Sequence, residues 1–166
     1  MLPDRTFIIR AQDGKWGIVQ FVGPDMNQIA DFEYDYIGVF AANEKLAPTD
    51  FQYYVALKNG QWLLLDNTGK PATTPINDAI YANEGKVMIA KTSKNGYRLY
   101  NENGQLVDEL TFDGVYITEK GYVIAYKIGL RAIMTDNTGK VLKDFGLMYG
   151  DWPSYKYDDA TDEVVS

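Results

Sequence analysis

Two identical pentapeptides come nearest to a ligand-binding pattern in this sequence. DNTGK occurs at residues 66–70 and again at residues 136–140. Asp66 and Asp136 call for a calcium test, because carboxylates in short loops are common ligands of that ion. An EF-hand loop needs several alternating acidic residues and a closing glutamate, and DNTGK supplies too few oxygen atoms. We therefore interpret both segments as turns in which the aspartate accepts a hydrogen bond from the backbone two residues on.

The residue types that carry most catalysis are missing from the chain. It contains no cysteine and no histidine. That excludes disulfides, thiolate or imidazole metal sites, and both Ser-His-Asp and Cys-His nucleophiles. A glycosidase-like pair of carboxylates leaves no fixed sequence signature, and no pair stands out here. We therefore predict a protein that is not an enzyme and that uses no metal and no cofactor.

The distribution of charge limits the classes of binding partner that we expect. The net charge is −7, and the sixteen basic residues are scattered singly rather than clustered. This argues against nucleic acid and favours another protein with a basic surface. No run of about 18 apolar residues is present to span a membrane. The first residues lack the charged and apolar regions of a signal peptide, which indicates a cytoplasmic location.

The turns that contain Asp66 and Asp136 belong to a repeated sequence unit. Gly69, Gly104 and Gly139 are spaced by 35 and 35 residues, and apolar landmarks around them keep the same step. Trp16 and Trp62 are 46 residues apart, which places an insertion of 11 at about residues 41–52. We therefore predict about four degenerate copies of a unit near 35 residues long.

Each copy has the pattern of antiparallel β-structure. Apolar, β-branched segments are separated by Asp13-Gly14, Asn59-Gly60 and Asn95-Gly96, dipeptides that favour type I′ hairpins. We predict an all-β fold of hairpin or three-stranded units with ten to twelve strands, stacked as an array. An open array is favoured over a partly closed barrel or propeller-like ring, because the terminal copies differ from the middle ones. Residues 6–146 form the repeat domain, and residues 147–166 form a capping segment and a solvated acidic tail.

One copy carries a specific resemblance. The segment KWGIV at residues 15–19, followed by Gly23 and then by DYI at residues 35–37, resembles the WG (KWG) repeat of bacterial proteins. The resemblance covers residues 6–146, although only the first copy keeps Trp-Gly. It implies a β-rich scaffold for binding, and the family has no common catalytic motif to carry over.

Aromatic residues are the remaining candidates for function. Trp16, Trp62 and Tyr97 occupy equivalent places in successive copies, and we interpret them as core contacts between neighbours rather than a ladder for stacking a ligand. Other aromatics near the unit edges and in the C-terminal segment are candidate interface residues, because Tyr and Trp are enriched at protein interfaces. These candidates are Tyr34, Tyr36, Tyr53, Tyr81, Tyr116 and Trp152.

The sequence favours a non-enzymatic, protein-binding β-repeat scaffold of bacterial type. A small, acidic domain without catalytic residues also suits an immunity protein that neutralises a cognate bacterial toxin. A carbohydrate-binding module is the alternative from another class, because it too uses Tyr and Trp on a β-scaffold.

Overall fold

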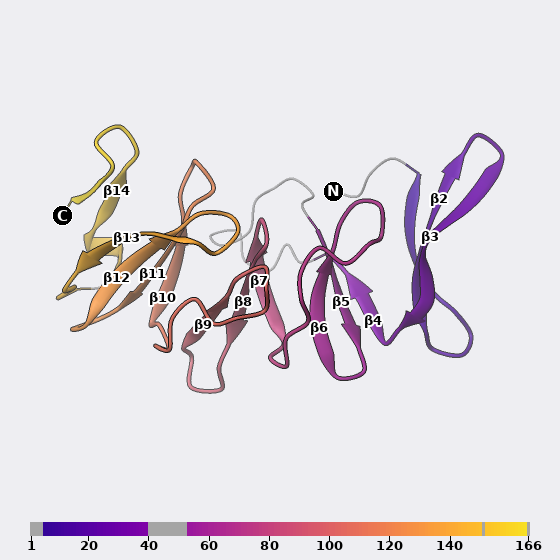
Figure 1. Cartoon of the computed structure of the whole chain (residues 1–166), viewed down its shortest axis with the longest axis horizontal. Helices are drawn as coiled ribbons and strands as arrows, with labels where there is room; N and C mark the ends of the chain where they lie inside the picture. The colour runs from indigo at the N-terminus through magenta and orange to yellow at the C-terminus, as the bar shows by residue number, and fades with distance from the viewer. Residues whose placement is uncertain (1–4, 40–52, 151, 166) are drawn as a thin grey trace.

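The strands lie in a row of small antiparallel sheets. The computed structural model describes residues 5–39, 53–150 and 152–165. These residues form fifteen strands in five antiparallel sheets, together with one short 3-10 turn at Trp152–Ser154. The first sheet lies at one end of the row and the last hairpin at the other, and the ends do not meet (Figure 1). The predicted all-β array is confirmed.

Four sheets correspond to the four copies, and we call them units 1 to 4. Unit 1 contains β1 (Thr6–Arg10), β2 (Trp16–Val22) and β3 (Asp25–Tyr34). Unit 2 contains β4 (Tyr36–Gly38), β5 (Tyr54–Lys58) and β6 (Gln61–Leu65). Unit 3 contains β7 (Ile80–Glu84), β8 (Val87–Lys91) and β9 (Tyr97–Tyr100). Unit 4 contains β10 (Gly114–Ile117), β11 (Val123–Lys127), β12 (Arg131–Thr135) and β13 (Val141–Gly146). The fifth sheet is the hairpin of β14 (Lys156–Asp158) and β15 (Glu163–Val165).

The strand count exceeds the prediction of ten to twelve. In the sequence, residues 75–80 and 110–116 fit the third strands of their units, but in the structure each segment divides between two units. Ile76 and Phe112 bridge to the edge of one sheet, whereas β7 and β10 begin the next sheet. The C-terminal hairpin adds two more strands. The predicted insertion at residues 41–52 lies outside the described residues.

The three landmark glycines occupy the same place in three equivalent turns. Asp66 N donates to Lys70 O at 2.8 Å, and Gly69 N donates to Asp66 O at 3.0 Å; the turns at 101–105 and 136–140 repeat both bonds. Gly69, Gly104 and Gly139 have φ of 81°, 73° and 95°. Each also lies against the preceding unit: a Cβ on Gly69 would be 2.2 Å from Ile29 O. Glycine is therefore required both for the backbone angle and for the close approach of two units.

The type I′ prediction is correct at one of its three positions. Asn59 and Gly60 both have positive φ, 53° and 78°, as that turn requires. The other two dipeptides lie in five-residue turns, closed by Ala11 N to Lys15 O and by Thr92 N to Gly96 O, both at 2.8 Å. In these longer turns only one residue takes the left-handed conformation, because the loop has a third residue over which to reverse.

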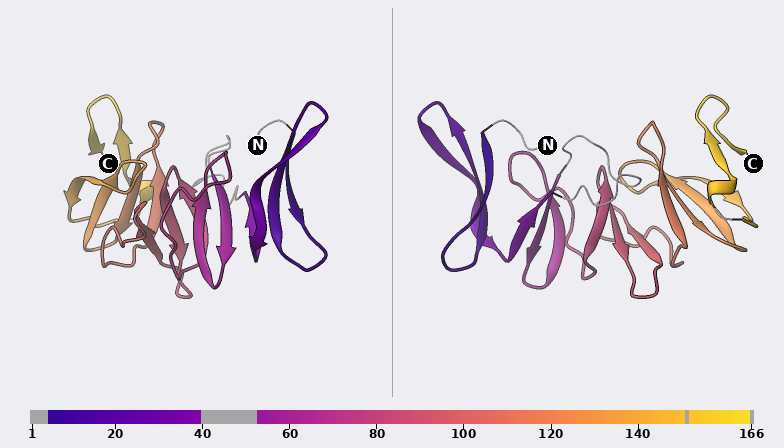
Figure 2. Two further views of the ribbon diagram at one scale, coloured as in Figure 1. Left: turned by 45° about the vertical axis from the view of Figure 1, so that its right-hand side comes forward. Right: turned by 180° about the vertical axis from the view of Figure 1, so that it is seen from behind.

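The core consists of layers between successive sheets. Units 1 and 2 meet around Ile18, Tyr54 and Leu65, and units 2 and 3 around Leu64, Ile80 and Met88. Units 3 and 4 meet around Ile89, Phe112 and Ile133. In the described residues, each core layer therefore joins two successive units, whose sheets follow one another along the row in Figure 2.

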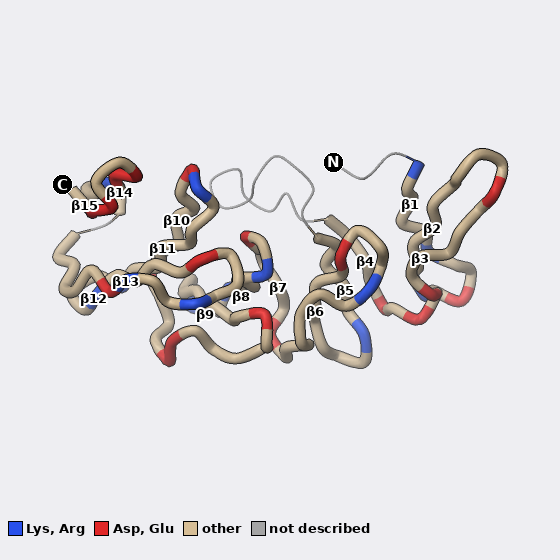
Figure 3. Tube along the Cα trace, turned by 45° about the horizontal axis from the view of Figure 1, so that its top comes forward, with Lys and Arg blue, Asp and Glu red and all other residues tan. Residues whose placement is uncertain are grey.

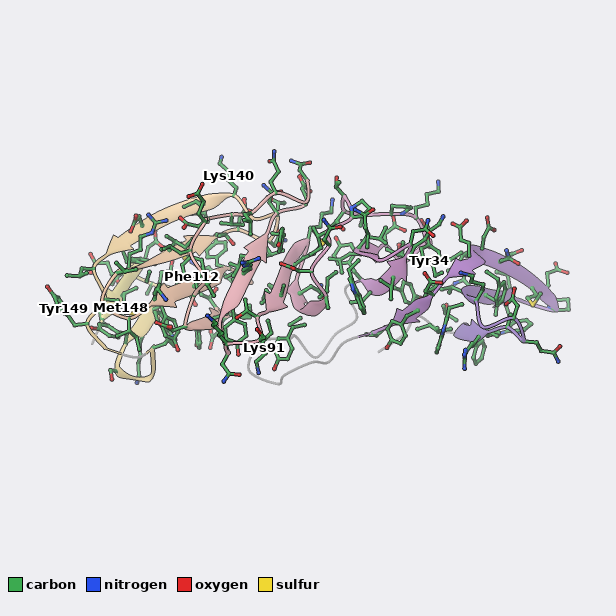
Figure 4. The ribbon with its side chains drawn as sticks, turned by 90° about the horizontal axis from the view of Figure 1, so that it is seen from below. Tyr34, Lys91, Phe112, Lys140, Met148 and Tyr149 are labelled. Carbon is green, nitrogen blue, oxygen red and sulfur yellow. The ribbon has the colours of Figure 1, made fainter. Side chains whose placement is uncertain are left out.

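A fourth apolar layer covers the far face of unit 4. Met148 and Trp152 pack with Tyr126 and Met134 there, and Tyr157 and Val164 of the last hairpin lie against them. Figure 4 places Met148 and Tyr149 at this end of the molecule. The prediction of a solvated acidic tail is therefore wrong: β14 and β15 pair in register and their apolar side chains form part of the cover.

Candidate functional site

The first sheet presents an apolar surface that we call the outer face. Phe7 pairs across the sheet with Val19, and Phe21 pairs with Met26, so these side chains share one face. Phe7, Ile9 and Met26 are 51%, 39% and 59% exposed. The rings of Phe7 and Phe21 meet edge to face at 5.9 Å. The residues of the outer face are Phe7, Ile9, Val19, Phe21, Met26 and Phe32.

A glycine shapes this surface. A Cβ on Gly17 would lie 2.9 Å from the Phe32 ring, so Gly17 allows that ring to lie across the strand. Val19 is 1% exposed beneath the surrounding rings. The outer face is therefore packed within itself and not a set of loose side chains.

Within the described residues, the outer face is the one face of units 1 to 4 that no other element covers. The opposite face of the first sheet packs on unit 2 through Ile8, Ile18 and Ala30. Both faces of units 2 and 3 contribute to core layers, and unit 4 lies between unit 3 and the C-terminal segment. The first sheet also stands at the end of the row in all views (Figures 1 and 2).

The aromatic candidates from the sequence do not gather into one patch. Tyr34 and Trp152 are 5% and 7% exposed, so their rings belong to core layers and offer little area to a partner. Tyr36, Tyr53 and Tyr81 are partly buried at different unit junctions, and Tyr116 is 38% exposed beside Trp152, with ring centroids 5.1 Å apart.

The three repeated aromatics lie beside neighbouring rings. Trp16 and Trp62 are partly buried on either side of Tyr36, with ring centroids at 5.3 Å and 6.2 Å from it. Tyr97 lies 6.0 Å from Tyr81 and packs against the layer between units 3 and 4. These contacts join strands and units.

A pocket of about 420 Å³ is lined by residues of both unit 1 and unit 2. Lys58 Nζ lies 5.7 Å from the centre of the Tyr34 ring and 3.1 Å from Glu33 Oε1. Burial, reinforced by the nearby Glu33 charge, raises the pKa of the Tyr34 hydroxyl. Of the two lysines that line this pocket, Lys58 is thus held by an acid and a ring from unit 1.

The aspartate that precedes β4 joins the turns of two units. Asp35 Oδ1 accepts a 2.6 Å hydrogen bond from Lys15 Nζ of unit 1, and Asp35 Oδ2 accepts one from Asn59 N of unit 2. The Lys15 bond, and then the Asn59 bond, lower the pKa of the Asp35 carboxyl. Asp113 makes the second of these hydrogen bonds before β10, where its Oδ2 accepts from Ile128 N of the same unit at 2.8 Å.

Sequence reasoning missed the outer face. The segment 7–9 was recognised as a strand, but not as one with an uncovered side. Two signals point to it. Units 2 to 4 have a strand that begins after Asp35, Asp78 or Asp113, and no such strand precedes β1 among the described residues. Apolar residues also occupy both faces of a sheet at the end of the array, which only a covered sheet needs.

Three further properties of the described residues concern metal binding, membrane spanning and the distribution of charge. Among the described residues, no cluster of three or more His, Cys, Asp or Glu side chains is arranged to hold a metal ion. Over the same residues, no helix has the length and apolar character needed to cross a membrane. Lys and Arg are interspersed with Asp and Glu along the turns (Figure 3).

Comparisons with known proteins add little. A scan against protein-family models gives no match, and a search of curated proteins gives none. Among solved structures, the chain is similar to one described as the crystal structure of HIRA(644-1017), with a TM-score of 0.34 and 10% identity. The match covers 87% of this chain and 54% of that one. The chain thus spans about half the length of this structural neighbour.

Proposed function

We propose that this chain is a non-enzymatic, protein-binding scaffold of WG-like β-repeats, and that its partner binds the outer face of the first sheet. The observation that carries the proposal is the exposure of Phe7, Ile9 and Met26 on a sheet whose counterparts are covered on both sides. Contiguous exposed apolar surface on a soluble domain marks interaction sites.

The charge of the chain supports the choice of partner. The outer face itself carries no charged side chain, whereas the whole chain has a net charge of −7. An acidic protein attracts partners with basic surfaces, and this attraction mainly speeds encounter. The apolar contacts then decide how long the complex lasts.

The test is covalent capture in cells of the source organism. A photo-crosslinking phenylalanine analogue at position 7 or 26 should yield one adduct of defined mass. The same analogue at Leu147, which is 53% exposed at the other end of the array, should yield no such adduct.

Two matched double variants distinguish specific binding at the outer face from nonspecific adhesion of exposed apolar residues. Phe7→Ser/Met26→Ser should abolish the adduct from a crosslinker at Ile9, whereas Ile128→Ser/Leu130→Ser should leave it intact. Ile128 and Leu130 are 47% and 50% exposed, so the two pairs remove similar apolar surface. Equal adduct yields from all three proteins would refute binding at the outer face.

A further inference from the structure

Among the described residues, the edge of the first sheet has no counterpart of a strand that the other three units contain. In unit 2, β4 pairs with β5; in unit 3, β7 pairs with β8; in unit 4, β10 pairs with β11. In unit 1, β1 is the equivalent of β5, β8 and β11, and in the sheet of described strands it forms the edge.

The equivalence follows from the strand register. Arg10 is opposite Trp16, just as Leu57 is opposite Trp62 and Tyr126 is opposite Ala132. Trp16, Trp62 and Ala132 occupy the same repeat position in the sequence. In the described part of the chain, unit 1 therefore has the equivalents of the later strands of a unit but not of its first strand.

The backbone at this edge points outward. Ala11 N donates to Lys15 O of the β1–β2 turn, and adjacent residues of an antiparallel strand alternate in direction. The N–H and C=O of Arg10 therefore face away from β2. In units 2 and 4 the matching carbonyls of Leu57 and Tyr126 accept 2.8 Å bonds from Asp35 N and Asp113 N.

A second backbone group at the β1 edge corresponds to an N–H that is hydrogen-bonded to an aspartate in units 2 and 4. The carboxylates of Asp35 and Asp113 accept hydrogen bonds from Asn59 N and Ile128 N, two residues beyond Leu57 and Tyr126. The residue two beyond Arg10 is Gln12, which is exposed. Arg10 adds a cation beside this point, and it too is exposed.

We propose that β1 takes up an extended segment of another protein in the position that the first strand occupies in units 2 to 4, running antiparallel to β1. The segment has the chemistry of the chain's own first strands: an aspartate, whose carboxylate accepts from Gln12 N, followed by apolar residues. This proposal rests on the proposed function and names the mode of binding. Strand addition to an exposed sheet edge is an established form of peptide recognition.

A peptide with the sequence of one of the chain's own first strands can test strand addition at β1. A capped synthetic hexapeptide of residues 113–118, DGVYIT, should bind the full-length protein and shift the amide resonances of Arg10 and Gln12 in an NMR titration. The same peptide with Asp113→Ala should bind more weakly by about tenfold, because it leaves Gln12 N without its acceptor.

Two protein variants isolate the backbone contribution. Arg10→Pro removes the outward N–H and should weaken peptide binding by about tenfold or more, as expected for a lost edge hydrogen bond. Arg10→Ala keeps that N–H and should weaken binding less. Both variants should keep the wild-type circular dichroism spectrum, because Arg10 is exposed and Pro is tolerated where the N–H faces away from the sheet.

Three outcomes would overturn the proposal. The first is no shift at Arg10 or Gln12 at millimolar peptide, and the second is equal affinity for wild type and Arg10→Pro. The third is a concentration-dependent dimer that Arg10→Pro abolishes, which would assign the edge to a second copy of this chain. None of these affects the crosslinking result at the outer face, so the proposed function stands or fails separately.

Discussion

The two ends of the array are built differently. At the C-terminal end, residues 147–165 cover the far face of unit 4 with Met148, Trp152 and the β14–β15 hairpin. At the N-terminal end, the equivalent face of unit 1 remains exposed, and its β1 edge has no described partner strand. Repeat arrays need polar or covered terminal faces for solubility. The difference teaches that apolar side chains cover the far face of unit 4, whereas the outer face of unit 1 has no described cover and is the surface where we propose that a partner binds.

The largest expected effect comes from removing the anchor of the cap. Trp152 is 7% exposed and its ring stacks on Tyr126 at 6.2 Å. Trp152→Ala should lower the free energy of unfolding by about 3–4 kcal/mol, in the range for buried large-to-small substitutions. Phe7→Ala, at the uncapped end, should cost less than about 1 kcal/mol because half of that ring is already in solvent. Urea unfolding followed by circular dichroism measures both, and equal losses would contradict the comparison.

A somewhat smaller effect tests how firmly unit 1 is attached. Gly69→Ala places a Cβ 2.2 Å from Ile29 O of unit 1, at φ of 81°. It should destabilise the protein by about 3 kcal/mol, because the clash adds to the left-handed backbone cost. Gly60→Ala is the control, with φ of 78° and no atom within 4 Å of the added Cβ. It should show the backbone cost alone, about 1–2 kcal/mol. If the two variants have the same melting temperature, the turn does not hold unit 1 in place.

Next in size is the loss of the terminal hairpin. Tyr157 and Val164 are partly buried against the unit 4 cover. Deleting residues 156–166 should therefore cost about 2 kcal/mol and expose the part of the unit 4 cover that the hairpin shields. The full-length variant Tyr157→Ser/Val164→Ser should reproduce most of that loss. Asp158→Asn/Glu163→Gln should not, since it removes charge and keeps the apolar contacts. Thermal melts of the three proteins decide whether the hairpin stabilises by its apolar side chains or by its acids.

The smallest effect concerns the turns that both halves of the array share. Burial opposes ionisation of Asp66 and Asp136, but hydrogen bonds from Thr68, Thr138 and backbone N–H groups outweigh it and lower the pKa of each carboxyl. A carboxyl whose pKa is lower in the folded state stabilises the fold above its unfolded pKa of about 3.9, and this stability is lost as pH falls through the folded value.

Asp66→Asn/Asp136→Asn should therefore lower stability slightly at neutral pH and flatten the acid limb of the stability curve below about pH 4. Asn101 already occupies the equivalent position in unit 3, where its Oδ1 accepts from Asn103 N and Gln105 N. Unfolding midpoints measured from pH 2 to pH 7 test this, and an unchanged acid limb would show that the two carboxylates do not contribute.

The repeat and the all-β class could be predicted because they depend on local chemistry. Gly69, Gly104 and Gly139 mark a turn that only a left-handed residue completes, and their spacing reveals the period. The unit boundary could not be placed, because Ile76 and Ile80 fit one short strand in the sequence and yet divide between two sheets. The tail was misjudged because its five acids hide two apolar positions, Tyr157 and Val164, on one side of a hairpin. The exposed outer face required knowledge of what packs on Phe7 and Ile9, which strand patterns do not contain.

The glycine turns also determine how the array responds to force. Glu102 N donates to Thr138 O, and Thr74 N donates to Glu102 O, so a few backbone bonds link units 2, 3 and 4. Units meet through their faces and these turns, and each described strand belongs to a single sheet. Pulled from its two termini, such a chain should extend in discrete steps, one unit after another, rather than in a single rupture. The unit with the weakest contacts should unfold at the lowest force, and the remaining units should unfold separately at higher forces.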